Sequence, residues 1–411
     1  MSKSSNANMV VFAHVPPPEH GQSRMVETML EGLSNRDVEV IHVDARVSEE
    51  MSDLGTDLIG KMLLMFGYLR QALVAKWRSG AKTLYYIPGP VIWSAVVSDW
   101  MVMAVLRLWY RDLILHWHAI GQGEWAHGSE RCRLPGPGWL DRVARKVSAL
   151  LFCRPDLSIA VSPTSDADAR AVGSRRIEVV CNGIDDPCPD FEESVIAIRR
   201  RRAEEIRDSG APEIRILFMS HGTVEKGLFD TLSALEKVLG RLDDRVRVSM
   251  TIAGGIAENR EARFVEELAK FKANPDLSVE IQRLNFVSGQ EKSDCFANAD
   301  LFVAASRWES FGLTVLEAMA WGLPVVAAAS DGVKGILSEE YEWMAPTANP
   351  ERLAEKLEMG VNCVLRGEGS VRGERLRERF MEAFQSECFL NGIRGVLAEH
   401  CEGVSVVDDT I

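Results

Sequence analysis

The sequence of 411 residues lacks several patterns that would assign it to other classes of protein. Its eight cysteines are scattered and form no Cys-x-x-Cys pair, which favours reduced thiols in a cytosol over a disulfide framework or a zinc site. No Gly-x-Gly-x-x-Gly motif opens a helix after the first expected strand, so hydride transfer with a dinucleotide is not indicated. No basic segment followed by an apolar run begins the sequence, and we therefore expect no signal peptide.

The chain also lacks a net positive charge, because 47 Lys and Arg stand against 60 Asp and Glu. We therefore expect no nucleic-acid partner. Residues 1–185 hold 20 basic and 20 acidic residues, so the net charge of −13 belongs to the remainder. Residues 51–150 differ from both, with 12 basic and 7 acidic residues. This local excess fits an ordinary mixed surface or attraction to an anionic acceptor or a membrane surface.

Two long apolar segments need an interpretation. Residues 91–110 are about long enough to cross a bilayer, but Asp99 and Arg107 interrupt them and a strand follows, so we expect a core helix. Residues 57–78 are apolar as well, and burial against a sheet is the favoured interpretation. The alternative is a helix lying on a membrane interface, because this segment also carries basic side chains. These are Lys61, Arg70, Lys76 and Arg78.

Short apolar runs alternate with helical patterns along the whole chain, which predicts parallel sheets covered by helices on both faces. The rhythm breaks over residues 186–212, where two prolines, a run of four arginines and Gly210-Ala-Pro212 follow one another. We place a domain junction there. The predicted domains are residues 1–190 and 191–385, with a helical tail over 386–411. The expected strands are residues 10–14, 38–43, 84–87, 113–117, 157–161, 177–181, 214–219, 248–253, 279–282, 301–305 and 325–329.

The most informative segment is residues 305–327, which read ASRWESFGLTVLEAMAWGLPVVA. A buried strand leads into a polar loop, a helix follows, and a second buried strand begins after Gly322-Leu-Pro324. We expect Ser310 to cap the helix at its start and Gly322 to end it in the left-handed conformation.

The polar side of this helix predicts an anion site. Ser310, Thr314 and Glu317 recur at i, i+4 and i+7 and therefore share one face. Backbone N–H groups beside Phe311-Gly312, at the positive end of the helix, would suit a phosphate. Glu309 precedes the helix and Glu317 lies two turns into it, so two carboxylates bracket the expected site.

This Glu-x7-Glu spacing stands inside Ser-x-x-Glu-Ser-Phe-Gly-Leu-x-x-x-Glu-Ala-Met-Ala-x-Gly-x-Pro-Val-Val. The whole block resembles the retaining, nucleotide-sugar-dependent glycosyltransferases of the GT4 family. The resemblance implies an α/β fold of the GT-B type, in which two Rossmann-like parallel-sheet domains face a cleft. It also implies that the N-terminal domain binds the acceptor and the C-terminal domain the nucleotide sugar. By the same resemblance, Glu309 would hold hydroxyls of the donor sugar and Glu317 those of the ribose. The donor diphosphate and sugar would contact Ser310, Phe311, Gly312 and Leu313.

A second motif, LFMSHGTVEKG at residues 217–227, resembles the family's loop after the first C-terminal strand. There an arginine and a lysine neutralise the donor diphosphate. Lys226 matches the lysine, whereas His221, followed by Gly222, stands in the position of the arginine. A neutral imidazole stabilises a leaving diphosphate less than a guanidinium does. Either His221 is protonated beside the diphosphate, or Lys226 and the helix amides carry that charge.

The N-terminal half contributes weaker signals. Gly21 and Gln22 stand in a Pro/Gly segment that resembles the family's cleft loop after the first strand. His118 ends a strand where the family keeps a histidine near the sugar ring, and the resemblance makes it a candidate catalytic residue. His116 lies two residues earlier and points the same way, but a packed core histidine is the alternative for it. A zinc interpretation of His-x-His needs a third ligand, and no pattern nearby supplies one.

The predicted function is transfer of a hexose from a nucleotide-diphosphate sugar to a glycan, a lipid-linked molecule or a small molecule, as in the synthesis of polysaccharides or glycoconjugates. Retention of configuration is implied by the resemblance alone. The catalytic candidates are Glu309, Lys226 and His118. Lysine and a helix dipole can replace a metal, so we expect no metal and no other cofactor. We expect a cytoplasmic location with peripheral membrane contact as an open alternative, and the oligomeric state is left open.

Other functions stay open beside this one. A sugar-nucleotide epimerase or a phosphorylase of GT-B fold would share the same donor site, and so would a non-catalytic nucleotide-sugar-binding protein. A glycosidase is disfavoured, because its retaining carboxyl pair lies about 5 Å apart and eight helical residues advance about 12 Å.

Overall fold

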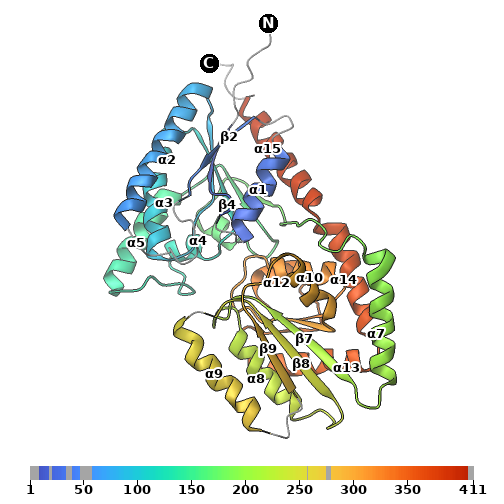
Figure 1. Cartoon of the computed structure of the whole chain (residues 1–411). Helices are drawn as coiled ribbons and strands as arrows, with labels where there is room; N and C mark the ends of the chain where they lie inside the picture. The colour runs from blue at the N-terminus through green and yellow to red at the C-terminus, as the bar shows by residue number, and fades with distance from the viewer. Residues whose placement is uncertain are drawn as a thin grey trace. The chain divides into compact units, whose positions relative to one another are not determined.

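The computed structural model describes residues 9–17, 21–33, 39–46, 58–256, 258–274 and 279–405. The chain divides into two compact units, each drawn in Figure 1. The first unit is Met1–Gly183 with Ser386–Ile411, and the second is Ile184–Gln385. Residues 186–212, which we expected to join two domains, lie within the second unit. There they form a π-helical turn, η2 (Phe191–Val195), and a helix, α7 (Ile196–Asp208).

The first unit is built on a sheet of six parallel strands in the order β2-β1-β3-β4-β5-β6. Every residue of β1, β3, β4 and β5 is buried, as expected for parallel strands covered on both faces. Helices α2 and α3 contribute to the core on one face of this sheet. The strands are β1 (Met9–Ala13), β2 (Val40–Asp44), β3 (Thr83–Tyr86), β4 (Asp112–Trp117), β5 (Leu157–Ala160) and β6 (Ile177–Val179). The helices are α1 (Gly21–Leu33), α2 (Leu58–Ser79), α3 (Trp93–Leu106), α4 (Gln122–Ala126), α5 (Gly138–Phe152), α6 (Ala167–Ala171) and α15 (Ser386–Ser405).

The last helix, α15, returns to the first unit and packs against α1 (Figure 1). Phe389, Ile393 and Leu397 are buried on its inner side, at the i, i+4, i+8 spacing of an apolar face. The Arg394 guanidinium donates a hydrogen bond of 2.8 Å to the carbonyl of Gly32. Helix α15 therefore contributes to the core of the first unit.

The second unit repeats the same design with the strand order β12-β11-β10-β7-β8-β9, again all parallel. Helices α8, α9 and α13 share one core with the strands, whereas α10 and α11 contact the sheet through β7 and β11. The strands are β7 (Glu213–Met219), β8 (Arg247–Ala253), β9 (Val279–Leu284), β10 (Leu301–Ala304), β11 (Val325–Ala328) and β12 (Met344–Ala345). The helices after α7 are α8 (Leu228–Leu239), α9 (Glu258–Ala273), α10 (Gly289–Asn298), α11 (Leu313–Ala320), α12 (Asp331–Leu337), α13 (Pro350–Leu365) and α14 (Gly369–Ala383).

The predicted α/β class with two parallel sheets is confirmed, and each predicted strand is present to within a few residues. Val38, the first residue of one predicted strand, lies outside the described residues. Only the two-residue β12 was not predicted, because two residues show no alternation. The apolar helix α3 buries Val96, Val102 and Leu106, as expected of a core helix. In the part of the chain that the structure describes, no helix could span a bilayer.

Candidate functional site

Two loops of the second unit meet beyond the carboxyl ends of neighbouring strands. One follows β7 and carries Lys226, and the other follows β10 and carries Glu309. Strands β7 and β10 pair in parallel, so both loops leave the same edge of the sheet. The Lys226 Nζ donates a hydrogen bond of 2.7 Å to Glu309 Oε2, with the side chains 29% and 20% exposed. The two catalytic candidates of this unit are therefore partners in one half-buried ion pair.

The close crossing of these loops is built into the backbone. Gly227 has φ 74°, and a Cβ added there would lie 2.0 Å from the carbonyl oxygen of Ala305. Only glycine permits both the left-handed conformation and this approach. Arg307 fixes the second loop from the other side with two hydrogen bonds of 2.7 Å to the carboxylate of Asp230. The two loops thus cross in close contact, which brings the Lys226 side chain to Glu309.

A narrow pocket lies under the ion pair, lined among others by Ser220, Ser306, Gly312 and Thr314. Its volume is about 10 Å³, on the order of a single water molecule. A larger ligand requires side chains around this pocket to move.

The helix that follows this pocket starts later than predicted. We expected Ser310 to cap it, but α11 begins at Leu313, with Gly312 at the N-cap at φ 106° and no side-chain cap. The turn before the helix is set from outside, because the N–H of Gly332 donates a hydrogen bond of 2.8 Å to the Glu309 carbonyl. Helical geometry leaves the amides of Leu313 and Thr314 without carbonyl partners. The predicted anion site would therefore lie at these two residues instead of beside Phe311-Gly312.

Phe311 cannot offer its ring to a ligand. Its side chain is buried against Phe384, with 6.1 Å between the ring centroids. Only the backbone of Phe311 could take part in the donor contact that the family resemblance implies. Gly322 ends α11 in the left-handed conformation, with φ 61°, as predicted.

Glu317 lies on α11 as a half-satisfied carboxylate. Its Oε1 accepts a hydrogen bond of 2.5 Å from Lys292 Nζ on α10. Its Oε2 is buried and has no hydrogen-bond partner among the described residues. An unpaired buried acceptor costs free energy, and this oxygen could accept a hydroxyl from a ligand only after the side chains that cover it move. No local pattern in the sequence singles out Lys292, because only the packing of α10 beside α11 brings it to Glu317.

His221 and Gly222 stand in the loop after β7. Desolvation, and then the nearby Lys226 ammonium, lower the pKa of His221 below its usual 6.5. Without a ligand the imidazole is therefore neutral at pH 7, and Lys226 is the standing positive charge of this loop. The N–H of Gly222 donates a hydrogen bond of 2.8 Å to the Gly255 carbonyl, which ties the loop to the end of β8.

The histidine pair lies at the carboxyl end of β4 in the first unit. Both rings are buried, with 4.1 Å between their centroids. His116 Nδ1 lies 2.5 Å from the Tyr85 hydroxyl and 3.2 Å from His118 Nε2. Burial and the neighbouring His118 hold the pKa of His116 well below its usual range. His116 is therefore a neutral, packed histidine, and among the described residues no three side chains form a metal-binding group.

The predicted loop after β1 ends earlier than expected, and the role of Gly21 and Gln22 at a cleft stays a prediction. Gly21 and Gln22 form the first turn of α1, whereas residues 18–20 of that segment lie outside the described residues. The helix extends this far because Ser23, Met25 and other residues of its inner side are buried from the first turn onwards.

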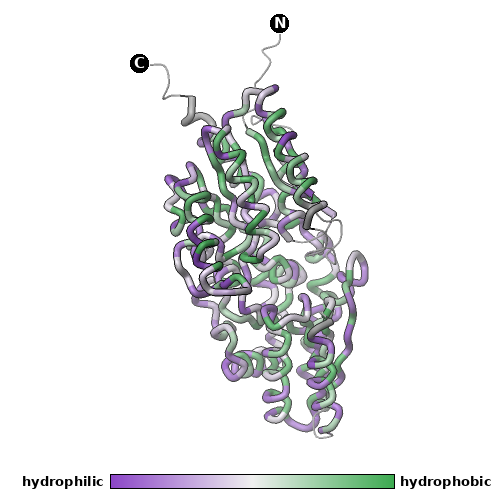
Figure 2. The backbone as a smooth tube through the Cα atoms, turned by 90° about the vertical axis from the view of Figure 1, so that its left-hand side faces the viewer, coloured by the Kyte–Doolittle hydropathy of each residue, from purple (hydrophilic) through white to green (hydrophobic). Residues whose placement is uncertain are grey.

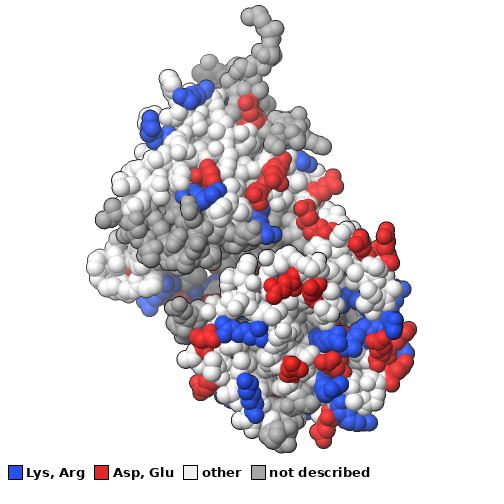
Figure 3. Space-filling model, in the orientation of Figure 1, with Lys and Arg blue, Asp and Glu red and all other residues white. Residues whose placement is uncertain are grey.

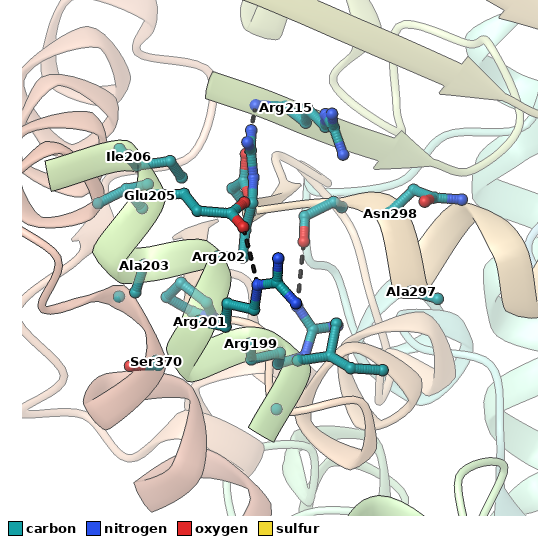
Figure 4. Close-up of a pocket in the computed structure, with 17 residues that line it drawn as sticks. Arg199, Arg201, Arg202, Ala203, Glu205, Ile206, Arg215, Ala297, Asn298 and Ser370 are labelled. Carbon is teal, nitrogen blue, oxygen red and sulfur yellow. Dashed lines mark hydrogen bonds and ion pairs between the residues drawn. The ribbon is translucent and has the colours of Figure 1, made fainter. Parts of the chain in front are cut away.

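A larger pocket of about 320 Å³ lies at the opposite edge of the second sheet (Figure 4). Arginines of α7 line it, but they are engaged within the unit. Arg199 donates to the carbonyls of Phe296, Ala299 and Trp321 at 2.5–3.0 Å. Arg202 pairs with Asp300 at 3.1 Å, and Figure 4 shows Arg201 turned to Glu205, its ion-pair partner at 3.0 Å. These guanidinium groups anchor α7, which explains why residues 186–212 belong to the second unit.

Comparison with known proteins gives a family match for part of the second unit. Residues 201–363 match the family model described as "Glycosyl transferases group 1", and this stretch contains both motifs of the second unit. The predicted resemblance is thereby confirmed: this part of the second unit is similar to group 1 glycosyltransferases. The Glu-x7-Glu roles and the other site assignments stay predictions.

Two relatives and one solved structure illustrate the similarity. The sulfoquinovosyl transferase SQD2 of Arabidopsis thaliana is 28% identical over 50% of this chain and 36% of its own length. A GDP-mannose:cellobiosyl-diphosphopolyprenol alpha-mannosyltransferase of Xanthomonas campestris is 27% identical over 53% of this chain and 52% of its own length. The aligned region thus spans about half or less of these relatives. The structure of Anabaena HepE with UDP and glucose aligns with 95% of this chain and 99% of its own at a TM-score of 0.62 and 16% identity, which supports the GT-B fold.

Proposed function

We propose that this protein transfers a hexosyl group from a nucleotide-diphosphate sugar to a hydroxyl of an acceptor. The observation that carries the proposal is the carboxyl-edge site of the second unit, where Lys226 pairs with Glu309 and Glu317 keeps one buried oxygen without a partner. Ligands of open parallel sheets bind beyond the carboxyl ends of the strands. A cation, a helix N-terminus and two carboxylates in one place suit a ligand with a diphosphate between two groups of hydroxyls.

The donor would replace the ion pair with its own contacts. Lys226 would turn to the diphosphate, and the carboxylate of Glu309 would then accept hydroxyls of the sugar. The second oxygen of Glu317 would accept a ribose hydroxyl while Lys292 keeps its hydrogen bond to the first oxygen. The amides of Leu313 and Thr314 would complete the diphosphate site, with Ser310 and Gly312 beside them.

The chemical demand is to stabilise charge as the bond between the anomeric carbon and the diphosphate oxygen breaks. The acceptor oxygen bonds to that carbon, and its proton is released. Preorganised donors aimed at the developing negative charge lower this barrier, and Lys226 with the helix amides supplies them without a metal. The resemblance to the family is the basis for two further proposals. His118 of the first unit belongs to the catalytic residues, and the anomeric configuration of the transferred sugar is retained.

The acceptor is proposed by class only. The named Xanthomonas relative acts on a diphosphopolyprenol-linked sugar, and HepE was solved with UDP and glucose. A glycan or lipid-linked acceptor, used at the cytoplasmic side of a membrane in glycoconjugate synthesis, fits the predicted class. A uridine or guanosine diphosphate sugar is the donor to test first.

A panel of nucleotide sugars tests this proposal, with thermal stabilisation measured first and turnover second. A matching donor should raise the melting temperature of the protein and of Glu309→Gln, but only the former should turn over. Glu358→Gln, on an exposed pair with Arg241, is the matched control. Turnover that requires added phosphate would indicate a phosphorylase. A product in which the sugar has changed while the nucleotide is intact would indicate an epimerase.

One observation favours the non-catalytic alternative. His221 replaces the family's arginine and is neutral without ligand, because burial and Lys226 lower its pKa. If a donor binds tightly and neither hydrolysis nor transfer occurs with any acceptor, the protein is a nucleotide-sugar binder and the catalytic proposal is overturned.

A further inference from the structure

The outer side of α2 in the first unit is apolar where a surface helix is normally polar. Leu63, Phe66 and Trp77 are 67%, 57% and 85% exposed. They lie on one face of the helix, because their spacing follows the i, i+3, i+14 positions of a 3.6-residue period. We call these three residues the α2 stripe. Single exposed apolar residues are common, but a row of them on one helix marks an interaction surface.

The turn after α3 extends this surface. Leu108 and Trp109 are both largely exposed, and the next residue holds the turn beside α2. The Tyr110 hydroxyl donates a hydrogen bond of 2.8 Å to the carbonyl of Ala72, and the Lys76 ammonium lies 4.9 Å from the centre of the Tyr110 ring. Helices α2 and α3 contact each other. Both lie on the left-hand side of Figure 1, and Figure 2 shows the chain from that side.

A groove of about 400 Å³ runs between the stripe and α3. Phe66, Leu73, Trp77 and Val105 line it, and Arg70 is its one charged residue. A second groove on the other flank of α2 is lined by Arg70 and Arg78. The apolar ridge is therefore bordered by guanidinium groups.

Within residues 58–112 the exposed charged side chains are all basic. From residue 58 to residue 112 the sequence holds only two acidic residues, Asp99 and Asp112, and both are buried. Arg70, Arg78 and Lys82 are exposed over the same range. The second unit differs, since Figure 3 shows basic and acidic side chains interspersed on the face that it draws. The surface around α2 thus complements a negatively charged partner.

We propose that this face docks the protein on a bilayer that contains anionic lipids. The α2 stripe with Trp109 would enter the interface between headgroups and acyl chains, where tryptophan is enriched. Arg70 and Arg78 would bind lipid phosphates, which attract basic side chains close to the membrane surface. The attachment is peripheral, because no helix of the described residues could span the bilayer.

A second copy of the chain is a poorer occupant. A two-fold symmetric dimer places the same patch on both sides of the interface. Arg70 and Arg78 of one copy would then meet those of the other, and among the described residues of this patch no exposed carboxylate would compensate them. Like charges placed together in this way repel each other.

Flotation of the full-length protein with vesicles tests the proposal without any donor or acceptor, so its outcome is independent of the transferase function. Vesicles of phosphatidylcholine alone are compared with vesicles that also contain phosphatidylglycerol. We expect binding to the anionic vesicles that weakens with added salt. Phe66→Ser with Trp77→Ser should reduce the partition coefficient at least about tenfold, and Arg70→Glu with Arg78→Glu should abolish the preference for anionic lipid.

The controls are matched variants in the second unit. Phe286→Ser removes a side chain that is 66% exposed, and Lys270→Glu with Lys272→Glu reverses two charges on α9. Neither control should change vesicle binding. Equal binding by the wild type and by the Phe66→Ser, Trp77→Ser variant would overturn the proposal. A dimer that this variant converts to a monomer, with vesicle binding unchanged, would overturn it in favour of a second copy.

Discussion

The second unit carries two charged clusters at opposite edges of one sheet, and they differ in what their charges contact. At the amino edge, Arg199 and Arg202 bind carbonyls and a carboxylate of their own unit. At the carboxyl edge, Lys226 and Glu309 form a pair that is about one quarter exposed, and Glu317 keeps a buried oxygen unpartnered. The larger pocket belongs to the first cluster, yet the second is the one with contacts left to offer. The contacts of the charged groups at the edge with both motifs, rather than the volume of a pocket, point to the candidate site.

The largest effect is expected from the amino edge and concerns stability alone. Arg199→Met would leave the carbonyls of Phe296, Ala299 and Trp321 without their guanidinium partner. Each buried acceptor left unpaired costs about 1–3 kcal/mol, so we expect a loss of about 3–5 kcal/mol in the free energy of unfolding. Urea denaturation measures it, with Arg201→Met as the exposed control. An unchanged midpoint would show that Arg199 is not an anchor.

Removal of the cation at the carboxyl edge should act on catalysis instead. Lys226→Met deletes a donor aimed at the departing diphosphate, and comparable deletions cost about 10²–10³-fold in kcat. Stability should change by less than about 1 kcal/mol, because partly exposed ion pairs contribute little. Turnover and urea denaturation of the same sample separate the two effects. A variant with full kcat would remove Lys226 from the catalytic set.

A smaller effect is expected at the other carboxylate. Glu317→Gln weakens the acceptor for the ribose hydroxyls, and we expect the dissociation constant of the donor to rise about tenfold, or about 1.4 kcal/mol. The value of kcat should hardly change, because a contact made equally in the ground and transition states affects binding only. Calorimetric titration with the donor measures this. A fall in kcat at constant affinity would contradict the assignment of Glu317 to the nucleotide.

The smallest effect is a dependence of donor binding on pH. Burial and Lys226 lower the pKa of His221 in the free protein, whereas a bound diphosphate would raise it. The complex then binds more protons than the free protein, so affinity should increase several-fold as pH falls from about 8 to about 6. The increase in affinity levels off below the pKa of His221 in the free protein, which lies under 6.5.

The matched variant for this measurement is His221→Asn. Donor affinity should lose the pH dependence that His221 contributes, while the fold is retained. An identical pH profile in the wild type and in His221→Asn would show that His221 does not respond to the diphosphate, and Lys226 with the amides would then be its only neutralising groups.

Local sequence pattern was sufficient for the strands and for the position of the motifs. Neighbouring residues alone predict the strands β7, β10 and β11, because a strand buried on both faces requires a run of apolar residues. They also predict the end of α11 at Gly322, because a left-handed turn favours glycine. The start of α11 was predicted wrongly, since the hydrogen bond from Gly332 to Glu309 comes from another element. The α2 helix was expected mainly as a core element, and its exposed stripe became visible only when its neighbours were in place.

The sequence alone determined the class of fold, the edge of the sheet where the motifs stand and the presence of Lys226 and Glu309 on two loops of that edge. These properties follow from periodicity and from the parallel direction of the strands, which are local or nearly so. The tertiary structure decided that Lys226 and Glu309 are partners, that Lys292 binds Glu317 and that the arginines of α7 are engaged. Contacts between residues far apart in the chain depend on packing, and no short pattern of residues encodes them.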